Sequence, residues 1–238
     1  MRRTVKKSRY ALRNEDQYVF GKDLSAAAAE AYKLLRTNIL FALPDEQKCR
    51  VIGVTSASGG EGKSTTALNL SYMLAEAGER VLLIEGDMRL PSIARQLKLE
   101  AAPGLSNVLA GRGEAREVLQ ESGLHSHLQV VSSGDIPPNP SELLSTKAAR
   151  VLIENLSEDY DFIVLDLPPA AGAADVLAAS RLTDGIIIVV RQNYTNRRDV
   201  ADAMQQFSYV NAKILGFVMT RTDTGQGKRR RGRRGGTA

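Results

Sequence analysis

Ser56-Ala57-Ser58-Gly59-Gly60-Glu61-Gly62-Lys63-Ser64-Thr65 is the stretch that decides the fold of this chain. It follows the β-branched run Arg50–Thr55 and precedes a helical pattern from Ala67 to Ala75. A strand, a glycine-rich turn and a helix in this order are typical of a phosphate-binding P-loop, whose amides and helix N-terminus attract an anion. The match is imperfect, because the strict pattern G-x-x-x-x-G-K-[ST] has glycine where this chain has Ala57.

This loop predicts where a nucleotide and its metal would bind. Lys63 would reach the β- and γ-phosphates, and the hydroxyl of Ser64 would hold magnesium. The predicted nucleotide-binding residues are Ser58, Gly59, Gly60, Glu61, Gly62, Lys63, Ser64 and Thr65.

Three carboxylates follow strands further along the chain. Arg80–Asp87 reads as a buried strand that delivers Glu85 and Asp87 to its C-terminal end, and Asp161–Asp166 does the same for Asp166. Ligands of open parallel sheets bind beyond the carboxyl ends of the strands. Carboxylates at that edge, beside a P-loop, suit a magnesium nucleotide: some fix the metal and its waters, and one activates a nucleophile.

Strand patterns alternate with helical patterns over most of the chain. We expect strands near residues 50–55, 80–86, 127–132, 161–166, 184–190 and 214–220. We expect helices over 26–41 (capped by Ser25), 63–77, 141–156, 173–181 and 196–210, with short helical pieces at 92–97, 105–109 and 114–120. The alternation predicts an α/β fold of the P-loop NTPase type, a single domain with a mostly parallel sheet covered by helices on both faces.

Charge divides the chain into three parts. The net charge is +5, but residues 1–24 carry +4, residues 225–238 carry +6, and residues 25–224 carry −5. We therefore expect a basic flexible segment over 1–24, the P-loop domain over 25–224, and a disordered basic tail over 225–238. The basic ends would be attracted to an anionic membrane surface. No aromatic residue interrupts the tail to stack on bases, which disfavours specific binding of nucleic acid.

The composition favours a cytoplasmic location. A single cysteine, Cys49, allows no disulfide within the chain. No apolar run approaches the roughly 20 residues that cross a bilayer, and the basic N-terminus lacks the apolar stretch of a secretory signal.

Taken together, these motifs resemble the bacterial tyrosine kinases of capsule and exopolysaccharide synthesis, in the form that is a separate polypeptide from its membrane activator. The resemblance covers about residues 25–224. Its motifs are Walker A at 56–65, A′ at Leu83–Arg89, and B at Ile163–Pro169. Segments 30–39 and 133–144, the latter with Pro-Pro-Asn-Pro-Ser-Glu, also resemble the family.

The resemblance implies a role for each motif residue. Lys63 would bind phosphate, Ser64 and Asp87 would hold magnesium directly, and Asp166 would hold it through water. Glu85 would take the proton from a tyrosine hydroxyl, and Arg89 would steady phosphate charge. The implied catalytic residues are Lys63, Glu85, Asp87, Arg89 and Asp166, the metal ligands are Ser64, Asp87 and Asp166, and the cofactors are ATP and Mg²⁺.

The same resemblance implies two kinds of partner. The Glu30–Arg36 segment is similar to a helix that mediates ring-shaped self-association in the family. The other partner is a transmembrane activator, which would place the chain at the inner face of the plasma membrane. Lys33 stands where that helix usually has its first arginine, so it keeps the charge but loses the bidentate fork, and assembly would be weaker.

The chain departs from the family in three further places. Glu85 replaces the usual aspartate of the A′ motif, Leu167 replaces a threonine, and residues 210–238 contain no tyrosine, where the family has a phosphorylated cluster. The acceptor would then lie elsewhere, on Tyr10, Tyr18 or another protein. Two alternatives stay open: a partitioning-like ATPase, disfavoured by Ser58 at the place of that class's lysine, and a non-phosphorylating adaptor that organises a membrane complex.

Overall fold

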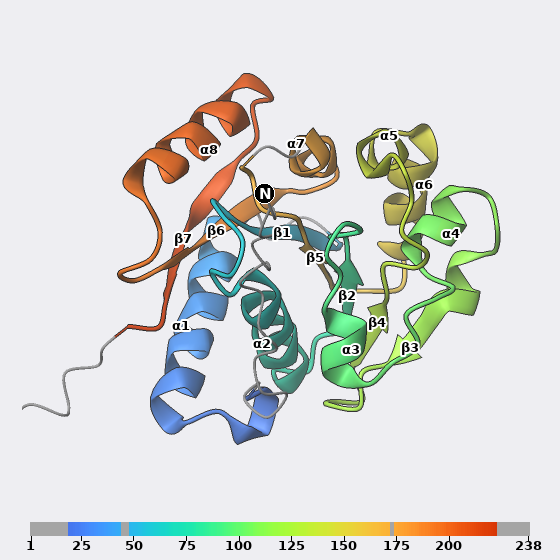
Figure 1. The fold of residues 1–238 in the computed structure, drawn as a ribbon. Helices are drawn as coiled ribbons and strands as arrows, with labels where there is room; N and C mark the ends of the chain where they lie inside the picture. Colours follow the sequence, from blue (N-terminus) through green and yellow to red (C-terminus); the bar gives the residue numbers. More distant parts are fainter. Residues whose placement is uncertain (1–18, 44–47, 172–173, 223–238) are drawn as a thin grey trace, which may run out of the picture.

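The computed structural model describes residues 19–43, 48–171 and 174–222. A seven-stranded sheet forms its centre, in the order β3-β4-β2-β5-β1-β6-β7 (Figure 1). The strands are β1 (Arg50–Ser56), β2 (Val81–Glu85), β3 (Leu119–Glu121), β4 (Leu128–Val131), β5 (Phe162–Asp166), β6 (Gly185–Arg191) and β7 (Ile214–Thr220). All neighbours are parallel except β3, which runs antiparallel to β4. The mostly parallel sheet is as predicted. The order of its strands could not be predicted from the spacing of the strands along the sequence.

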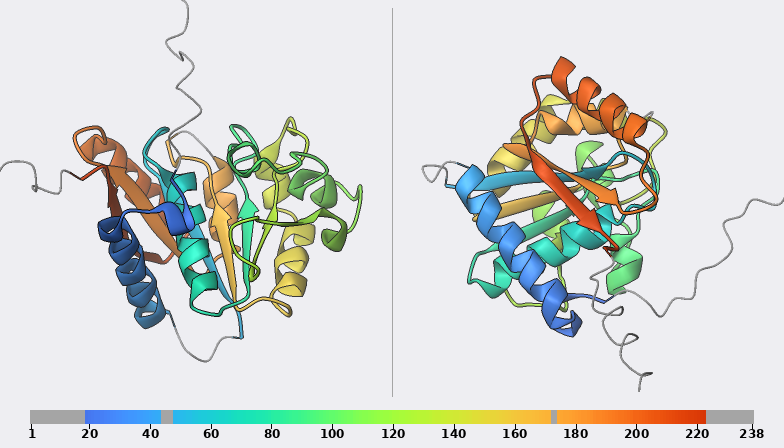
Figure 2. Two further views of the ribbon diagram at one scale, coloured as in Figure 1. Left: turned by 90° about the horizontal axis from the view of Figure 1, so that it is seen from below. Right: turned by 90° about the vertical axis from the view of Figure 1, so that its left-hand side faces the viewer.

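Helices cover both faces of this sheet (Figure 2). One face is covered by α1 (Ala26–Ala42) and α2 (Lys63–Glu76), with α3 (Ile93–Leu97) beside them. The other carries α4 (Leu105–Leu109), α5 (Pro140–Leu144), α6 (Lys147–Leu156), α7 (Ala174–Ser180) and α8 (Arg197–Tyr209). Each face has its own apolar core, because alternate residues of the buried strands point to opposite faces. The predicted two-sided α/β fold is confirmed.

Two predicted helices are wrong in detail. The helix expected over 141–156 is broken into α5 and α6, because the Thr146 side chain accepts a hydrogen bond from the amide of Ala149 and caps a new helix. The piece expected over 114–120 is a short 3₁₀ helix, η2 (Ala115–Val118), followed by edge strand β3. The side chain of Gln120 exchanges hydrogen bonds with the backbone of Glu100, a non-local contact that favours the extended form.

The domain begins earlier than the charge pattern suggested. A 3₁₀ turn, η1 (Gly21–Asp23), lies against α2, where the amide of Gly21 donates to Asn69 Oδ1 over 3.0 Å. Phe20 and Leu24 pack on the same core as α1. The end of the expected flexible segment therefore belongs to the fold. Residues 1–18, with Tyr10 and Tyr18, and the tail from residue 223 lie outside the described residues.

Candidate active site

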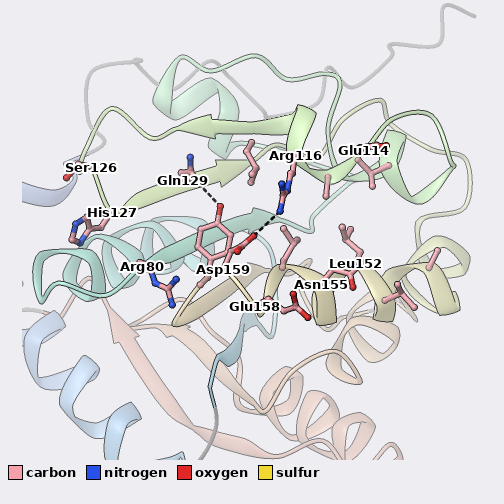
Figure 3. A pocket seen from close by; sticks show the side chains of 17 residues that line it. Arg80, Glu114, Arg116, Ser126, His127, Gln129, Leu152, Asn155, Glu158 and Asp159 are labelled. Atoms are coloured by element: carbon pink, nitrogen blue, oxygen red, sulfur yellow. Dashed lines mark hydrogen bonds and ion pairs between the residues drawn. The ribbon is translucent and has the colours of Figure 1, made fainter.

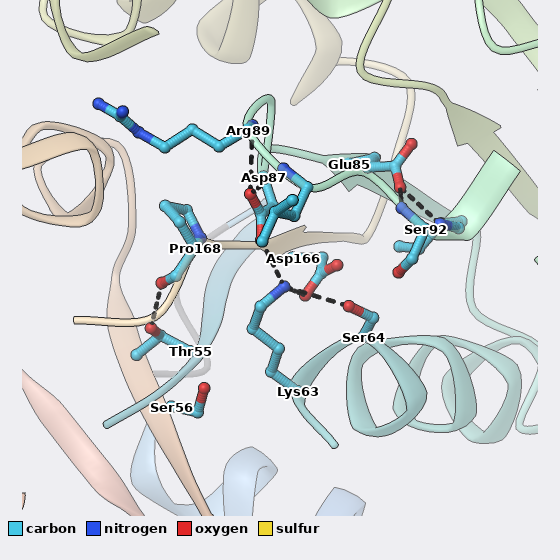
Figure 4. Close-up of polar contacts among 12 residues, drawn as sticks. Thr55, Ser56, Lys63, Ser64, Glu85, Asp87, Arg89, Ser92, Asp166 and Pro168 are labelled. Carbon is cyan, nitrogen blue, oxygen red and sulfur yellow. Dashed lines mark hydrogen bonds and ion pairs between the residues drawn. The ribbon is translucent and has the colours of Figure 1, made fainter. Parts of the chain in front are cut away.

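Lys63 stands at the centre of a cluster of oxygen atoms at the carboxyl edge of the sheet (Figure 4). Its Nζ lies 2.8 Å from Asp87 Oδ2, 3.5 Å from Asp166 Oδ1 and 3.2 Å from Ser64 Oγ. The cluster forms because β1, β2 and β5 are adjacent and parallel, so that the P-loop and both acidic segments leave the sheet at one edge. The structure thus brings together the four residues that the motifs predicted for phosphate and metal.

The backbone of the loop is shaped by glycine. Gly62 has φ +99° and caps α2, a left-handed conformation that other residues adopt only with strain. The position therefore requires glycine, and α2 begins at Lys63 with its first amides directed at the loop.

Burial and charge set the protonation of the cluster. Burial raises the pKa of Asp166 to about 6, even though Lys63 and Ser64 act to lower it. Burial also acts to lower the pKa of Lys63, but Asp166 and Asp87 outweigh this effect and raise the pKa. Lys63 therefore stays protonated. The second carboxylate oxygen of Asp166, Oδ2, is buried and has no hydrogen-bond partner among the described residues.

Asp87 is held by the turn that follows β2. Its Oδ1 accepts hydrogen bonds from the amides of Arg89, at 3.3 Å, and Leu90, at 3.0 Å, and its side chain is only 3% exposed. This arrangement leaves Oδ2 for Lys63. The A′ motif therefore fixes one carboxylate oxygen and directs the other into the cluster.

Glu85 lies at the end of β2 and is held by backbone amides from two other segments. Its side chain is fully buried, and one oxygen accepts a hydrogen bond from the amide of Ser92 (Figure 4). The amides of Ile93 and Ser133 also donate to this carboxylate. Hydrogen bonds from three amides hold the carboxylate in one orientation, toward the start of α3 and the segment after β4. These contacts make Glu85 an anchor for the start of α3, and its role as the catalytic base stays a prediction.

Replacing Glu85 by glutamine should lower the free energy of unfolding by about 1–3 kcal/mol, because the NH₂ group of the new side chain would face backbone donors. Urea denaturation checks this value, with Glu154→Gln on an exposed part of α6 as the control. A Glu85→Gln protein of unchanged stability that has lost phosphotransfer would instead support Glu85 as the base.

Arg89 also lies away from the cluster. Its guanidinium pairs with the buried carboxylate of Asp175 on α7, through Nε to Oδ2 and Nη2 to Oδ1. Burial acts to raise the pKa of Asp175, but the hydrogen bonds from Arg89 and Ser141, together with the charge of Arg89, outweigh it and hold the pKa below its usual value. In this conformation Arg89 joins the A′ turn to α7, a contact that the sequence motif did not reveal.

Two loop residues use their side chains within the fold. Ser58 Oγ donates to Asp199 Oδ2 on α8 over 3.2 Å. The buried carboxylate of Glu61 accepts hydrogen bonds from the amide of Ser58, at 3.0 Å, and from the hydroxyl of Thr195, at 2.6 Å. Both groups that Ser58 could donate from, its hydroxyl and its amide, are therefore engaged within the fold, and the Glu61 side chain is engaged as well.

A groove of about 990 Å³ lies elsewhere, between α6 and strands β3 and β4 (Figure 3). Arg116 and Asp159 pair across it at 3.9 Å, and Tyr160 donates to Gln129 Oε1 over 2.5 Å. Its lining contains no residue of the P-loop or of the acidic motifs. The groove is therefore separate from the Lys63 cluster.

This fold and this cluster define a P-loop nucleotide-binding protein of the α/β class. The sequence profile of the AAA domain family matches residues 49–215. Over 191 residues the chain is 39% identical to the tyrosine-protein kinase YwqD of Bacillus subtilis, covering 80% of each protein. The chain therefore belongs to the bacterial tyrosine-protein kinase family, as its motifs predicted.

Solved structures agree with this assignment. The kinase domain of the Escherichia coli tyrosine kinase ETK has a TM-score of 0.80 and 28% identity, over 92% of this chain and 88% of that one. The chimerical protein CapA2B2 has a TM-score of 0.76 and 34% identity, over 81% of this chain and 84% of that one. The fold predicted from the P-loop is thus the fold of solved tyrosine kinase domains.

Proposed function

We propose that this tyrosine kinase transfers the γ-phosphate of ATP to a tyrosine hydroxyl and thereby regulates capsular or exopolysaccharide synthesis. The observation that carries the proposal is the position of Lys63 Nζ, between Asp87, Asp166 and Ser64 at the mouth of the P-loop. A cation and oxygen ligands at one edge of the sheet are what a phosphoryl-transfer site requires, because its catalysis is mostly positioning and charge neutralisation.

The donor set fits Mg²⁺. The side chains of Ser64, Asp87 and Asp166 offer only oxygen atoms, the ligands that this ion prefers. The buried Oδ2 of Asp166 accepts no hydrogen bond from any of the residues that the structure describes. Bound there, Mg²⁺ would neutralise charge on the nucleotide phosphates. Ser64 and Asp87 would hold it directly and Asp166 through water.

The chain's own groups supply what phosphoryl transfer requires besides the metal ion. Lys63 would carry positive charge to the phosphates, since its raised pKa keeps it protonated. The amides of the loop and of the first turn of α2 would bind the phosphate oxygens. A loose transition state asks little of a general base. Phosphoryl transfer at this site is therefore compatible with a Glu85 side chain that is held by backbone amides.

In this proposal the acceptor tyrosine lies outside the described residues of the chain or on another protein. Tyr72 and Tyr160 are buried, which makes them poor acceptors. Tyr209, at the end of α8, is 72% exposed, and Tyr194 is 55% exposed. Tyr10 and Tyr18 remain our predicted acceptors within the chain, together with tyrosines of other proteins.

Self-association through α1 and a transmembrane activator are further parts of the proposal. Glu30 and Lys33 are exposed and pair with each other at 3.2 Å, whereas Arg36 Nη1 donates to the carbonyl of Met73 over 2.8 Å. Leu34 and Phe41 are also exposed on α1. Among the described residues, no helix combines the length and the apolar character needed to cross a bilayer. We infer that the activator brings the chain to the inner face of the plasma membrane, aided by the basic ends.

A non-phosphorylating ATPase or adaptor is the second candidate. The burial of Glu85 and the pairing of Arg89 with Asp175 favour it, because both residues were expected to act on the reacting groups. Its predicted behaviour is ATP-dependent assembly without phosphotyrosine.

Phosphotyrosine mapping by mass spectrometry in the native bacterium separates the two candidates. The comparison is between the unaltered chain, Asp87→Asn, and Asp202→Asn as an exposed control on α8. A kinase yields phosphotyrosine on Tyr10, Tyr18 or another protein that Asp87→Asn removes and Asp202→Asn retains. Phosphotyrosine that is absent, or indifferent to Asp87→Asn at equal protein levels, contradicts the kinase and supports the adaptor.

A further inference from the structure

The carbonyl groups of the P-loop are all engaged by the surrounding fold. Six consecutive carbonyl oxygens, from Ala57 to Gly62, accept hydrogen bonds. The donors are Ala171 N to Ala57 O (3.0 Å), Ser56 Oγ to Ser58 O (2.7 Å), Tyr194 Oη to Gly59 O (3.1 Å), Arg191 Nη1 to Gly60 O (3.2 Å), Thr220 Oγ1 to Glu61 O (2.7 Å) and Thr66 N to Gly62 O (2.9 Å). They come from the segment after β5, from β1, β6 and β7, from the loop after β6, and from α2.

This pattern fixes the direction of the amides. In a planar trans peptide the carbonyl of one residue and the N–H of the next point in opposite directions. The amides of residues 59–63 therefore point away from these donors. A loop whose carbonyls are held in this way presents its N–H groups to an anion without first having to reorganise.

Two of the six donors belong to a single stacked pair. The guanidinium carbon of Arg191 lies 4.5 Å from the centroid of the Tyr194 ring, so each side chain supports the other over adjacent carbonyls. Tyr194 is 55% exposed, and a Cβ added at Gly60 would meet its hydroxyl at 3.5 Å. Its ring therefore contributes little to the core, and its fixed contacts are with the P-loop and Arg191.

We infer that Tyr194, stacked on Arg191, is a positioning residue for the phosphate-binding loop. By holding the carbonyls of Gly59 and Gly60, the pair keeps the next amides aimed at the phosphates of a nucleotide. Tyr194 touches the loop and not the reacting atoms. The inference rests on the proposed binding of ATP at this loop.

Titration of the full chain with a fluorescent ADP derivative tests this role, using Tyr194→Phe and, as a matched control, Tyr209→Phe. Tyr209 is also an exposed tyrosine, but its hydroxyl contacts Gln205 on α8, far in sequence from the loop. Removing one neutral hydrogen bond should weaken nucleotide binding about three- to tenfold in Tyr194→Phe. Tyr209→Phe should bind as the unaltered chain does.

Two further readouts separate positioning from general stability. Tyr194→Phe should raise the KM for ATP and leave kcat at saturating ATP and the melting temperature unchanged. Arg191→Ala combined with Tyr194→Phe should weaken binding by less than the product of the single effects, because both act on one stretch of loop.

The outcomes are distinguishable from a failure of the proposed function. If the unaltered chain binds nucleotide and Tyr194→Phe binds equally well, the positioning role is wrong and the proposed function stands. If Tyr194→Phe loses nucleotide binding and its melting temperature falls as well, the positioning role is also wrong, because the effect is then one of general stability. If the unaltered chain binds no nucleotide, both proposals fall together.

Discussion

Replacing Lys63 by alanine should lower the rate of phosphotyrosine formation by at least about a thousandfold, because this side chain is the one cation among the described residues of the cluster. The same substitution should also lower the stability of the fold. Without Lys63, Asp87 and Asp166 face each other in a buried site with no neutralising charge. Unpairing a buried ion pair of this kind costs about 3–5 kcal/mol, and protonation of Asp166 would recover part of it.

The rate is checked with radiolabelled ATP and the stability with urea denaturation in the absence of nucleotide. Lys147→Ala, at the exposed start of α6, is the control for loss of a lysine. A Lys63→Ala protein that still forms phosphotyrosine at more than about a tenth of the original rate would contradict the assignment of the site.

The stability of the metal-free chain should depend on pH through Asp166. Its pKa is about 6 in the fold and 3.8 ordinarily, so the folded chain binds a proton that the unfolded chain releases. The resulting contribution to the free energy of unfolding is fully present below a pH of about 4 and is lost as pH rises through about 6. It amounts to about 3 kcal/mol in full, and to about 1–1.5 kcal/mol between about pH 5 and pH 7.5.

Asp166→Asn isolates this contribution, since asparagine does not titrate. We expect the stability of Asp166→Asn relative to the unaltered chain to increase by about 1–1.5 kcal/mol over that range, in EDTA without nucleotide. Asp202→Asn, exposed on α8, should show no such trend. A stability difference that is constant with pH would mean that Asp166 is charged throughout.

The part of the site that could be predicted from sequence is the part built by strands. Lys63, Asp87 and Asp166 converge because each follows a strand of one parallel sheet, and strand ends are visible in the hydrophobic pattern. The break at Thr146 could also have been detected, since a threonine between two helical stretches is a frequent N-cap.

The remainder depends on contacts between distant segments. Glu85 is held by amides that reach it only when α3 and the segment after β4 pack on the A′ turn. Arg89 meets Asp175 across 86 residues, and Tyr194 meets Gly59 across 135. A local motif identifies residue types at one strand end, but it carries no information about the side chains that arrive from elsewhere.

The hydrogen bond from Thr220 to the carbonyl of Glu61 has a consequence for the order in which the protein is made. The two residues are 159 positions apart, and Thr220 ends β7, the last strand of the sheet. During synthesis the glycine-rich motif leaves the ribosome long before β6, the loop with Tyr194, or β7. A growing chain therefore carries the complete motif without its outer support. The phosphate-binding loop reaches its finished form only when the final strand has joined the sheet.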